Sequence, residues 1–155
     1  MNKLLLLVSH AAVLTVGVGL GIYALPILVA PPGPTDAEVG AQTAEASYRG
    51  DFRRTLKDSD PLHWGEGTVS VSAKRIGLVG ELSPGPDYKL YLSPAFVETE
   101  VEFKRLKPSM ARIGDIKTFK NFVVPVPESV DPARYNTVVI WCERFDQFIT
   151  AAQYR

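Results

Sequence analysis

The segment VSVSAKRIGLVGEL, Val69 to Leu82, shows the clearest periodicity in the chain. In its first half, apolar residues alternate strictly with serine and lysine, which places the two kinds on opposite faces of an extended strand. The pattern continues from Ile76 to Leu82. The segment therefore predicts half-buried β-strands, each with one face toward a core and one toward solvent.

Similar short runs, rich in β-branched and aromatic residues, recur on both sides of this segment between Gly, Pro and Asp breaks. We predict strands at Tyr48–Arg53, Val69–Lys74, Ile76–Leu82, Tyr88–Ser93, Val97–Lys104, around Ile113 and Ile116, at Phe122–Val126 and at Val138–Phe145. The glutamates that alternate with apolar residues after Val97 are interpreted as a solvated face. About eight or nine strands without helical periodicity after Ser47 predict an all-β sandwich or flattened barrel.

The front of the chain has a different character. Leu4 to Leu25 carries no Asp, Glu, Lys or Arg, and as one helix it would extend about 33 Å, close to the hydrocarbon thickness of a bilayer. A secretory signal normally has a shorter apolar core with small residues before the cut, whereas Ala30 is followed by two prolines. We predict one retained N-terminal transmembrane α-helix, with a cleaved signal peptide as the alternative.

The charges around this helix predict its orientation. Lys3 and the N-terminal amine flank one end, whereas the first charges beyond the other end are Asp36 and Glu38. The positive-inside rule then predicts a single-pass protein of the cell membrane with a cytoplasmic N-terminus and a periplasmic or extracellular β domain. Gly17 and Gly21 have the spacing that lets a second helix approach closely, so they are candidate helix contacts, with lipid-facing glycine as the alternative.

The chain therefore divides into a transmembrane anchor at 1–30, a linker at 31–47 and a β domain at 48–155. The linker opens with prolines that stop the helix, and it continues with small and polar residues. Thr35 and Glu38 have the spacing of a capping box, which predicts a short helix from Asp36 to Ala46.

Composition and motifs narrow the classes of function. Lys plus Arg and Asp plus Glu both number 17, so no net charge draws the chain to nucleic acid and we predict no nucleic-acid partner. The sequence has no C-x-x-C pair, Gly-rich phosphate loop, G-x-S-x-G or H-E-x-x-H. Hydrolase and nucleotide-binding functions have no residues to carry them. We predict no metal site, and a non-enzyme over an enzyme.

Cys142 is the only cysteine, so an intrachain disulfide is impossible. Free cysteine is among the most buried residue types, which favours a structural role. Alternation places Cys142 and Arg144 on one face of their strand and Trp141 and Glu143 on the other. Both faces are apolar up to Cys142, so the direction of the sulfur stays open. A reactive role would need a nearby cation, and Arg144 is the local candidate.

His63 stands beside Trp64 between two turn signals. We interpret it as a loop histidine, with a ligand or proton carrier as the alternative. The chain lacks C-x-x-C-H, which excludes covalent c-type haem. Cys142, His63 and Met110 are residue types that serve as axial haem ligands, so a noncovalent haem is an alternative. No spacing supports it, and we predict no cofactor.

Four blocks of sequence carry a resemblance to a known family. They are YRGDF at Tyr48–Phe52, HWGEGTVSV at His63–Val71, GPDYKLYLS at Gly85–Ser93 and VVIWCERF at Val138–Phe145. In this order and spacing they resemble the DM-thirteen domain, a small extracytoplasmic module described as an electron-transfer domain. The resemblance covers nearly all of residues 48–152, and it departs from the family's pattern in the loop at Ser109–Arg112.

The resemblance implies an all-β fold and a redox role centred on Cys142, either as a bare thiol or as a ligand to a prosthetic group. His63 matches the family's histidine block and is the second redox candidate. Gly85, Pro86 and Asp87 match its G-P-D motif. We expect this motif to be a structural turn in which the Asp87 side chain caps backbone N–H groups.

These observations leave two main hypotheses for function. The first is an accessory subunit of a membrane redox complex, respiratory or photosynthetic, that docks through its helix and β domain on the lipid bilayer and on other subunits. The second is an electron-transfer module that uses Cys142. A third, an adhesion or ligand-binding sandwich, rests on analogy of fold alone.

Overall fold

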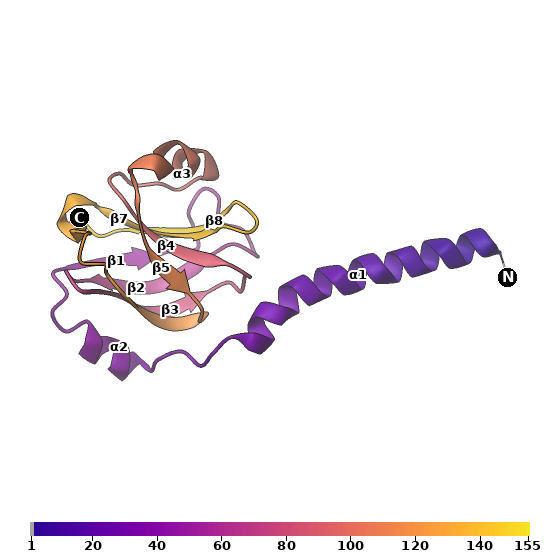
Figure 1. Cartoon of the computed structure of the whole chain (residues 1–155), viewed down its shortest axis with the longest axis horizontal. Helices are drawn as coiled ribbons and strands as arrows, with labels where there is room; N and C mark the ends of the chain where they lie inside the picture. The colour runs from indigo at the N-terminus through magenta and orange to yellow at the C-terminus, as the bar shows by residue number, and fades with distance from the viewer. Residues whose placement is uncertain (1) are drawn as a thin grey trace.

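The computed structural model describes residues 2–155 and shows a long helix that projects from one end of a β sandwich (Figure 1). The long helix, α1 (Lys3–Val29), is followed by a short helix, α2 (Asp36–Gln42). A third helix, α3 (Glu100–Leu106), and two 3₁₀ turns, η1 (Lys107–Ser109) and η2 (Pro132–Arg134), lie between strands. The predicted order of one N-terminal apolar helix and one all-β domain is confirmed.

Eight strands form two four-stranded antiparallel sheets. One sheet has the order β1-β2-β3-β6 and the other has the order β5-β4-β7-β8. The strands are β1 (Tyr48–Phe52), β2 (Gly65–Val71), β3 (Arg75–Leu82), β4 (Tyr88–Ser93), β5 (Ala111–Ile116), β6 (Lys120–Pro125), β7 (Thr137–Cys142) and β8 (Gln147–Gln153). The two sheets do not close on themselves, so the domain is a sandwich rather than a barrel.

The alternating segment at Val69 to Leu82 forms the β2–β3 hairpin at the centre of the first sheet. Val69 pairs with Leu78, and Val71 pairs with Ile76. All four side chains are buried in the core between the sheets. The hydroxyl of Ser72 accepts a hydrogen bond from Arg75 N at 2.9 Å, which closes the turn. Burial of the apolar set on one face fixes the register, since a slip of one residue would expose it.

The prediction of a strand at Val97–Lys104 is wrong, because most of this segment is α3. The Thr99 hydroxyl accepts a hydrogen bond from Glu102 N at 3.2 Å and so caps the helix, and two glutamates lie in its first turn. Both features stabilise a helix N-terminus. Phe103 is buried whereas Val101 is 78% exposed, so the alternation of Val and Glu does not mark two faces of a strand.

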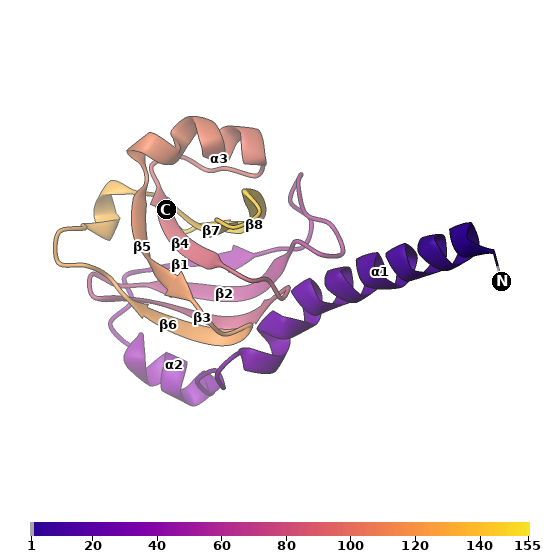
Figure 2. The ribbon, with the colours of Figure 1, turned by 45° about the vertical axis from the view of Figure 1, so that its right-hand side comes forward.

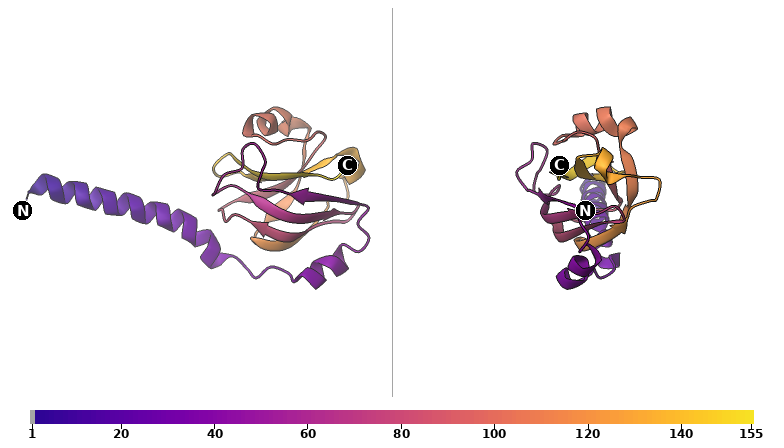
Figure 3. Two further views of the ribbon diagram at one scale, coloured as in Figure 1. Left: turned by 180° about the vertical axis from the view of Figure 1, so that it is seen from behind. Right: turned by 90° about the vertical axis from the view of Figure 1, so that its left-hand side faces the viewer.

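The helix predicted in the linker is confirmed, although it ends at Gln42 rather than Ala46. Thr35 and Glu38 form the reciprocal hydrogen bonds of a capping box, at 3.2 and 2.7 Å. Val39 is buried against the outer face of the first sheet, where Gly77 leaves room for it. Figure 3 shows α2 on the side of the sandwich opposite α3. Much of the linker is therefore packed on the domain.

α1 is long and apolar enough to cross a membrane, although a secretory signal sequence meets the same criteria. Its only buried residue is Pro26. Proline lacks an N–H and removes one hydrogen bond of the helix, which favours a bend. In Figure 1 the last turns of α1 bend toward the sandwich. The rest of the helix presents apolar side chains outward.

Candidate functional site

Cys142 is the last residue of β7 and points between the two sheets. It is 2% exposed, and it packs in the same core cluster as Val138 and Ile140. Trp141 belongs to a second cluster on the outer side of the sheet, under α3. The predicted alternation along this strand is correct, and the structure adds the direction of the sulfur, which the sequence left open.

A cavity of about 130 Å³ lies between this end of the sandwich and α1. It is lined by Gly19, Ile22, Tyr23, Leu62, His63, Pro84, Gly85, Pro86, Tyr88, Cys142, Phe145, Gln147 and Ile149. The cavity therefore brings together Cys142, His63 and the G-P turn, which are far apart in the sequence. Met110 packs in the cluster under α3 instead.

The environment of Cys142 keeps its thiol protonated. Burial raises the pKa of Cys142, and contacts with the backbone of Phe145, Asp87 and Arg144 oppose this only in part. The side chain of Arg144 is exposed in the turn after β7. Because the thiolate is the reactive and metal-binding form, this state of Cys142 is a poor nucleophile and a poor ligand.

We expect Cys142 to resist a thiol reagent such as a disulfide dye in the native protein and to react fully once the protein is unfolded. Replacement by alanine should lower the free energy of unfolding by about 1 to 2 kcal/mol, because burial of the sulfur is lost. Reaction rates with and without denaturant test the first point, and denaturant titration tests the second. Rapid labelling of the folded protein would contradict the buried position.

His63 is held in the turn before β2 by Asp60. Its Nδ1 lies 2.8 Å from Asp60 Oδ2, and the other carboxylate oxygen accepts hydrogen bonds from the N–H groups of Leu62 and His63. Burial opposes ionisation of Asp60, but these bonds lower its pKa. The carboxylate thus fixes the imidazole, and Nε2 is the nitrogen left to face another group.

The Gly85–Asp87 segment forms the turn between β3 and β4. A Cβ at Gly85 would lie 2.4 Å from the ring of Tyr88, so this glycine allows close packing of the tyrosine. The carbonyl of Asp87 accepts a hydrogen bond from Glu143 N at 3.0 Å. Its carboxylate contacts Lys89 Nζ at 2.6 Å, whereas the sequence predicted that it would cap backbone N–H groups.

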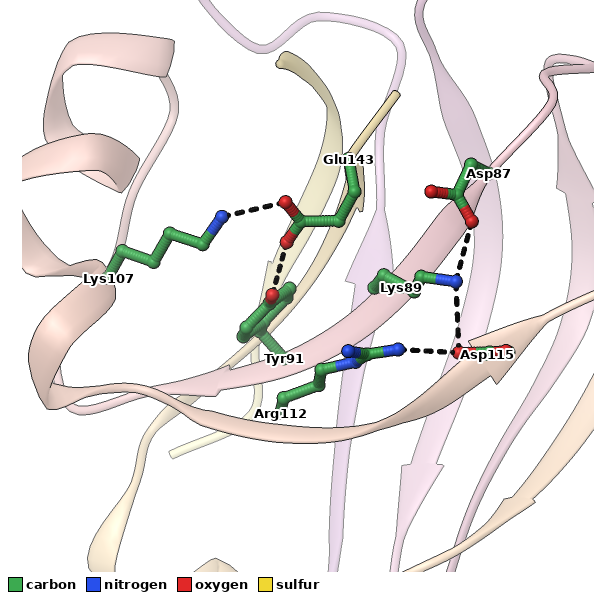
Figure 4. A network of polar contacts seen from close by, with 7 residues as sticks. All are labelled: Asp87, Lys89, Tyr91, Lys107, Arg112, Asp115 and Glu143. Atoms are coloured by element: carbon green, nitrogen blue, oxygen red, sulfur yellow. Dashed lines mark hydrogen bonds and ion pairs between the residues drawn. The ribbon is translucent and has the colours of Figure 1, made fainter. Parts of the chain in front are cut away.

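A polar network lies on the outer side of the second sheet and includes Glu143, the residue after Cys142 (Figure 4). Lys89 Nζ lies 2.6 Å from Asp87 and 3.1 Å from Asp115, and Asp115 also contacts Arg112 at 3.0 Å. Close by, Glu143 accepts hydrogen bonds from the Tyr91 hydroxyl and, at 2.8 Å, from Lys107 Nζ.

The Glu143 side chain is ionised and the Tyr91 phenol is neutral. Burial works against ionisation of Glu143, but the hydrogen bonds from Lys107 and Tyr91 lower its pKa. Burial and the neighbouring Glu143 raise the pKa of Tyr91. The tyrosine is thus a permanent hydrogen-bond donor to the carboxylate at neutral pH.

An aromatic cluster joins this network to α3. Phe103 stacks on Trp141 with ring centroids 3.9 Å apart and meets Tyr91 edge to face at 5.3 Å. Lys107 Nζ lies 5.6 to 5.9 Å from the centroids of all three rings, within the range of a cation–π interaction. Aromatic packing and two ion pairs, Lys104 with Asp146 and Lys107 with Glu143, therefore hold α3 and η1 on the sheet.

The lowered pKa of Glu143 makes stability depend on acidity. The carboxyl of Glu143 binds a proton more readily in the unfolded chain than in the folded one. The ionised side chain therefore contributes fully to the free energy of unfolding above its ordinary pKa of about 4.5. This contribution is lost as the pH falls through the lower pKa of the folded state. We expect Glu143→Gln to flatten the fall of stability in acid. Urea titrations across this pH range measure it.

Glu128→Gln is the matched control, because Glu128 is exposed in the loop after β6. It should leave the acid dependence unchanged. A wild-type slope in the Glu143→Gln variant would show that the ion pair with Lys107 does not stabilise the fold.

No motif in the sequence singles out Tyr91, Lys107 or Tyr88. Tyr91 and Lys89 lie two residues apart on β4 and beside Val139 and Trp141 of β7. These neighbours cannot be predicted from the sequence, because the register between β4 and β7 is not known from it. The one indication in the sequence is Glu143, because alternation places its carboxylate on the same strand face as Trp141. A carboxylate on an apolar face needs a cationic partner when it is buried.

The residues around the cavity do not fit a haem. A cavity of about 130 Å³ is smaller than the pockets that hold ligands of drug size, and Met110 lies in a different cluster. Within residues 2–155, no three His, Cys, Asp or Glu side chains gather in a way that could hold a metal ion. The chemistry that these residues offer is a protonated thiol, an oriented imidazole and two tyrosine side chains.

Comparison with known proteins gave a match to one family model. No curated protein and no solved structure matches the chain. The family model described as "Electron transfer DM13" matches residues 55–154. The match includes β2, β3 and β6 of the first sheet and all of the second sheet, together with Cys142 and His63. The chain belongs to the electron transfer DM13 family.

Proposed function

We propose that the chain is a membrane-anchored, extracytoplasmic accessory subunit of a membrane redox complex. The family supports a redox-related role. The observation that carries the anchor is the surface of α1, whose large apolar side chains are mostly 45 to 80% exposed along its length. Such a surface requires lipid or neighbouring helices. The same surface is the means by which a subunit would pack in a complex.

The two candidate contact glycines support a partner helix. A Cβ at Gly17 or Gly21 would meet no atom of the chain within 4 Å. Both glycines are thus open to a second helix, and small residues four apart allow two backbones to come close. The buried thiol of Cys142 also suits a subunit that docks rather than reacts.

The test is extraction of the full chain from its membrane in a mild detergent, followed by identification of the chains that copurify. We expect redox subunits to accompany it. Gly17→Leu with Gly21→Leu should release them, whereas Ala12→Leu, which adds bulk on the opposite side of α1, should not. A protein that migrates alone would contradict the subunit hypothesis.

A second candidate function is an electron-transfer module centred on Cys142. One observation favours it: Cys142 and His63, the two redox candidates, line the same cavity together with Tyr23 and Tyr88. The absorption spectrum of the purified chain separates the two functions. A visible chromophore, or a thiol that reacts in the native state, would favour electron transfer through this site.

A further inference from the structure

We propose that the end of the sandwich next to α1 rests on the bilayer and inserts Leu62 and Phe145 into its interface. The inference rests on the proposed membrane anchor, and it adds that the β domain is seated on the lipid. Figure 2 shows α1 leaving the sandwich at the end that also bears the loop before β2 and the β7–β8 turn.

The length of α1 sets the depth of this end. About 20 helical residues cross the hydrocarbon of a bilayer, and α1 has 27, beginning at Lys3. A crossing that starts at Lys3 ends near Ile22, which places Tyr23 in the interface that tyrosine prefers. Ile22 and Tyr23 line the cavity together with Leu62 and Phe145. Leu62 and Phe145 therefore lie next to the part of α1 at which the crossing ends.

Leu62 and Phe145 are unusually exposed for large apolar residues. They are 56% and 52% exposed, and they come from two separate loops that meet at one cavity. Among the other large apolar residues of 48–155, only Val101, at 78%, is more than half exposed. The side chains of Leu62 and Phe145, beside the end of α1, form one apolar surface. The lipid around α1 is the nearest apolar phase that can cover this surface.

The charges at this end suit lipid phosphates. Four of its carboxylates lie beside a basic group: Asp60 beside His63, Asp87 and Asp115 beside Lys89, and Asp146 beside Lys104. By contrast, Arg144 and Lys117 are exposed and form no ion pair within residues 2–155. Arg144 adjoins Phe145, and Lys117 lies in a hollow lined by Pro26 and Val29. Unpaired cations of this kind attract anionic headgroups.

The connection after α1 keeps the sandwich close to the membrane. Asn121 Nδ2 donates hydrogen bonds to the carbonyl of Pro34 at 2.9 Å and to Asp36 Oδ1 at 2.7 Å. Pro26 is itself buried, and it lines a hollow together with residues of the domain. Only residues 30–33 lie between α1 and this attachment. The sandwich therefore has little freedom to move away from the point at which α1 leaves the bilayer.

The experiment places a tryptophan at each tip of the full chain. Leu62→Trp and Phe145→Trp are reconstituted in vesicles of phosphatidylcholine and phosphatidylglycerol, with or without bromine near the top of the acyl chains. Bromine quenches tryptophan that reaches it. We expect the emission added by either tryptophan to be blue-shifted and to be lost in brominated vesicles.

Val101→Trp is the matched control, since Val101 is an exposed apolar residue on α3, away from this end. Its added emission should not respond to bromine. Arg144→Glu with Lys117→Glu should reduce the quenching of Trp at position 145 in these anionic vesicles.

Three results would overturn the inference. If bromine does not quench the added emission while the chain stays in the vesicles in alkaline carbonate, the domain is not seated on lipid, although α1 still anchors the chain in the membrane. If the emission is blue-shifted yet insensitive to bromine, a protein covers the tips instead. If carbonate releases the chain, the proposed anchor fails as well.

Discussion

Replacing Trp141 by alanine is expected to lower the free energy of unfolding by about 3 to 5 kcal/mol, the usual cost of removing a large aromatic side chain from a core. Trp141 is fully buried, and its ring stacks on Phe103 at 3.9 Å and 8°. The strand backbone on one side is held by pairing with β4 and β8, so it cannot collapse into the space. The loss should loosen α3 first, because Phe103 is the buried residue of that helix.

Two controls separate loss of the stack from other effects. Trp141→Phe keeps an aromatic ring and removes the indole N–H, which is buried and has no hydrogen-bond partner within residues 2–155. Trp141→Phe should lower the free energy of unfolding less than Trp141→Ala, because it keeps an aromatic ring and breaks no hydrogen bond. Val101→Ala, on the exposed side of α3, should change stability by less than about 0.5 kcal/mol. Denaturant titration of the full chain in detergent measures all three. An alanine variant as stable as Val101→Ala would contradict the role of the stack.

The sequence predicted the strands well where burial repeats every second residue. Val69, Val71, Ile76 and Leu78 follow this rule, and all four line the core. Near Val97 the same rule failed, because Thr99 and its neighbouring glutamates cap a helix more strongly than their alternation favours a strand. β8 was not predicted, since Ile149, Ala151 and Ala152 are all buried and leave no alternating signal.

The candidate site was predictable residue by residue but not as an arrangement. Cys142 and His63 stood out by their chemistry, yet only the packing of the loop before β2 against the end of β7 makes them line one cavity. The partners of Glu143 come from α3's neighbour η1 and from β4, through the fold alone. Their positions depend on the pairing of strands and on α3, whose alternating sequence predicted a strand instead of a helix.

β7 connects the two halves of this region. Its inward side ends in Cys142 at the cavity near α1, and its outward side carries Trp141 and Glu143 under α3. A movement of α3 would therefore reach the strand that holds the thiol.

Placing two charges at the centre of α1 should have the largest effect of any change considered. Leu14→Asp with Val16→Asp is expected to cost about 5 to 7 kcal/mol of insertion free energy, at about 2.5 to 3.5 kcal/mol for each aspartate at the middle of a transmembrane helix. Both native side chains are more than half exposed on the helix, so no contact within the chain offsets the cost. The insertion equilibrium should shift by about four to five orders of magnitude. Alkaline carbonate extraction measures it as a move from the membrane to the soluble fraction.

The matched control carries the same two charges outside the helix. Ala41→Asp with Ala44→Asp alters exposed positions in and just after α2, and it should leave the chain in the membrane. If α1 were a cleaved signal, the outcome would differ in kind: the mature wild-type chain would begin after Ala30 by mass spectrometry, and the charged variant would fail to be exported instead of becoming soluble at full length. A retained transmembrane helix predicts an intact wild-type chain in the membrane fraction and an intact charged variant in the soluble fraction. A cleaved signal does not predict this pair of results, because only a retained helix stays in the hydrocarbon of the bilayer, where charged side chains are costly.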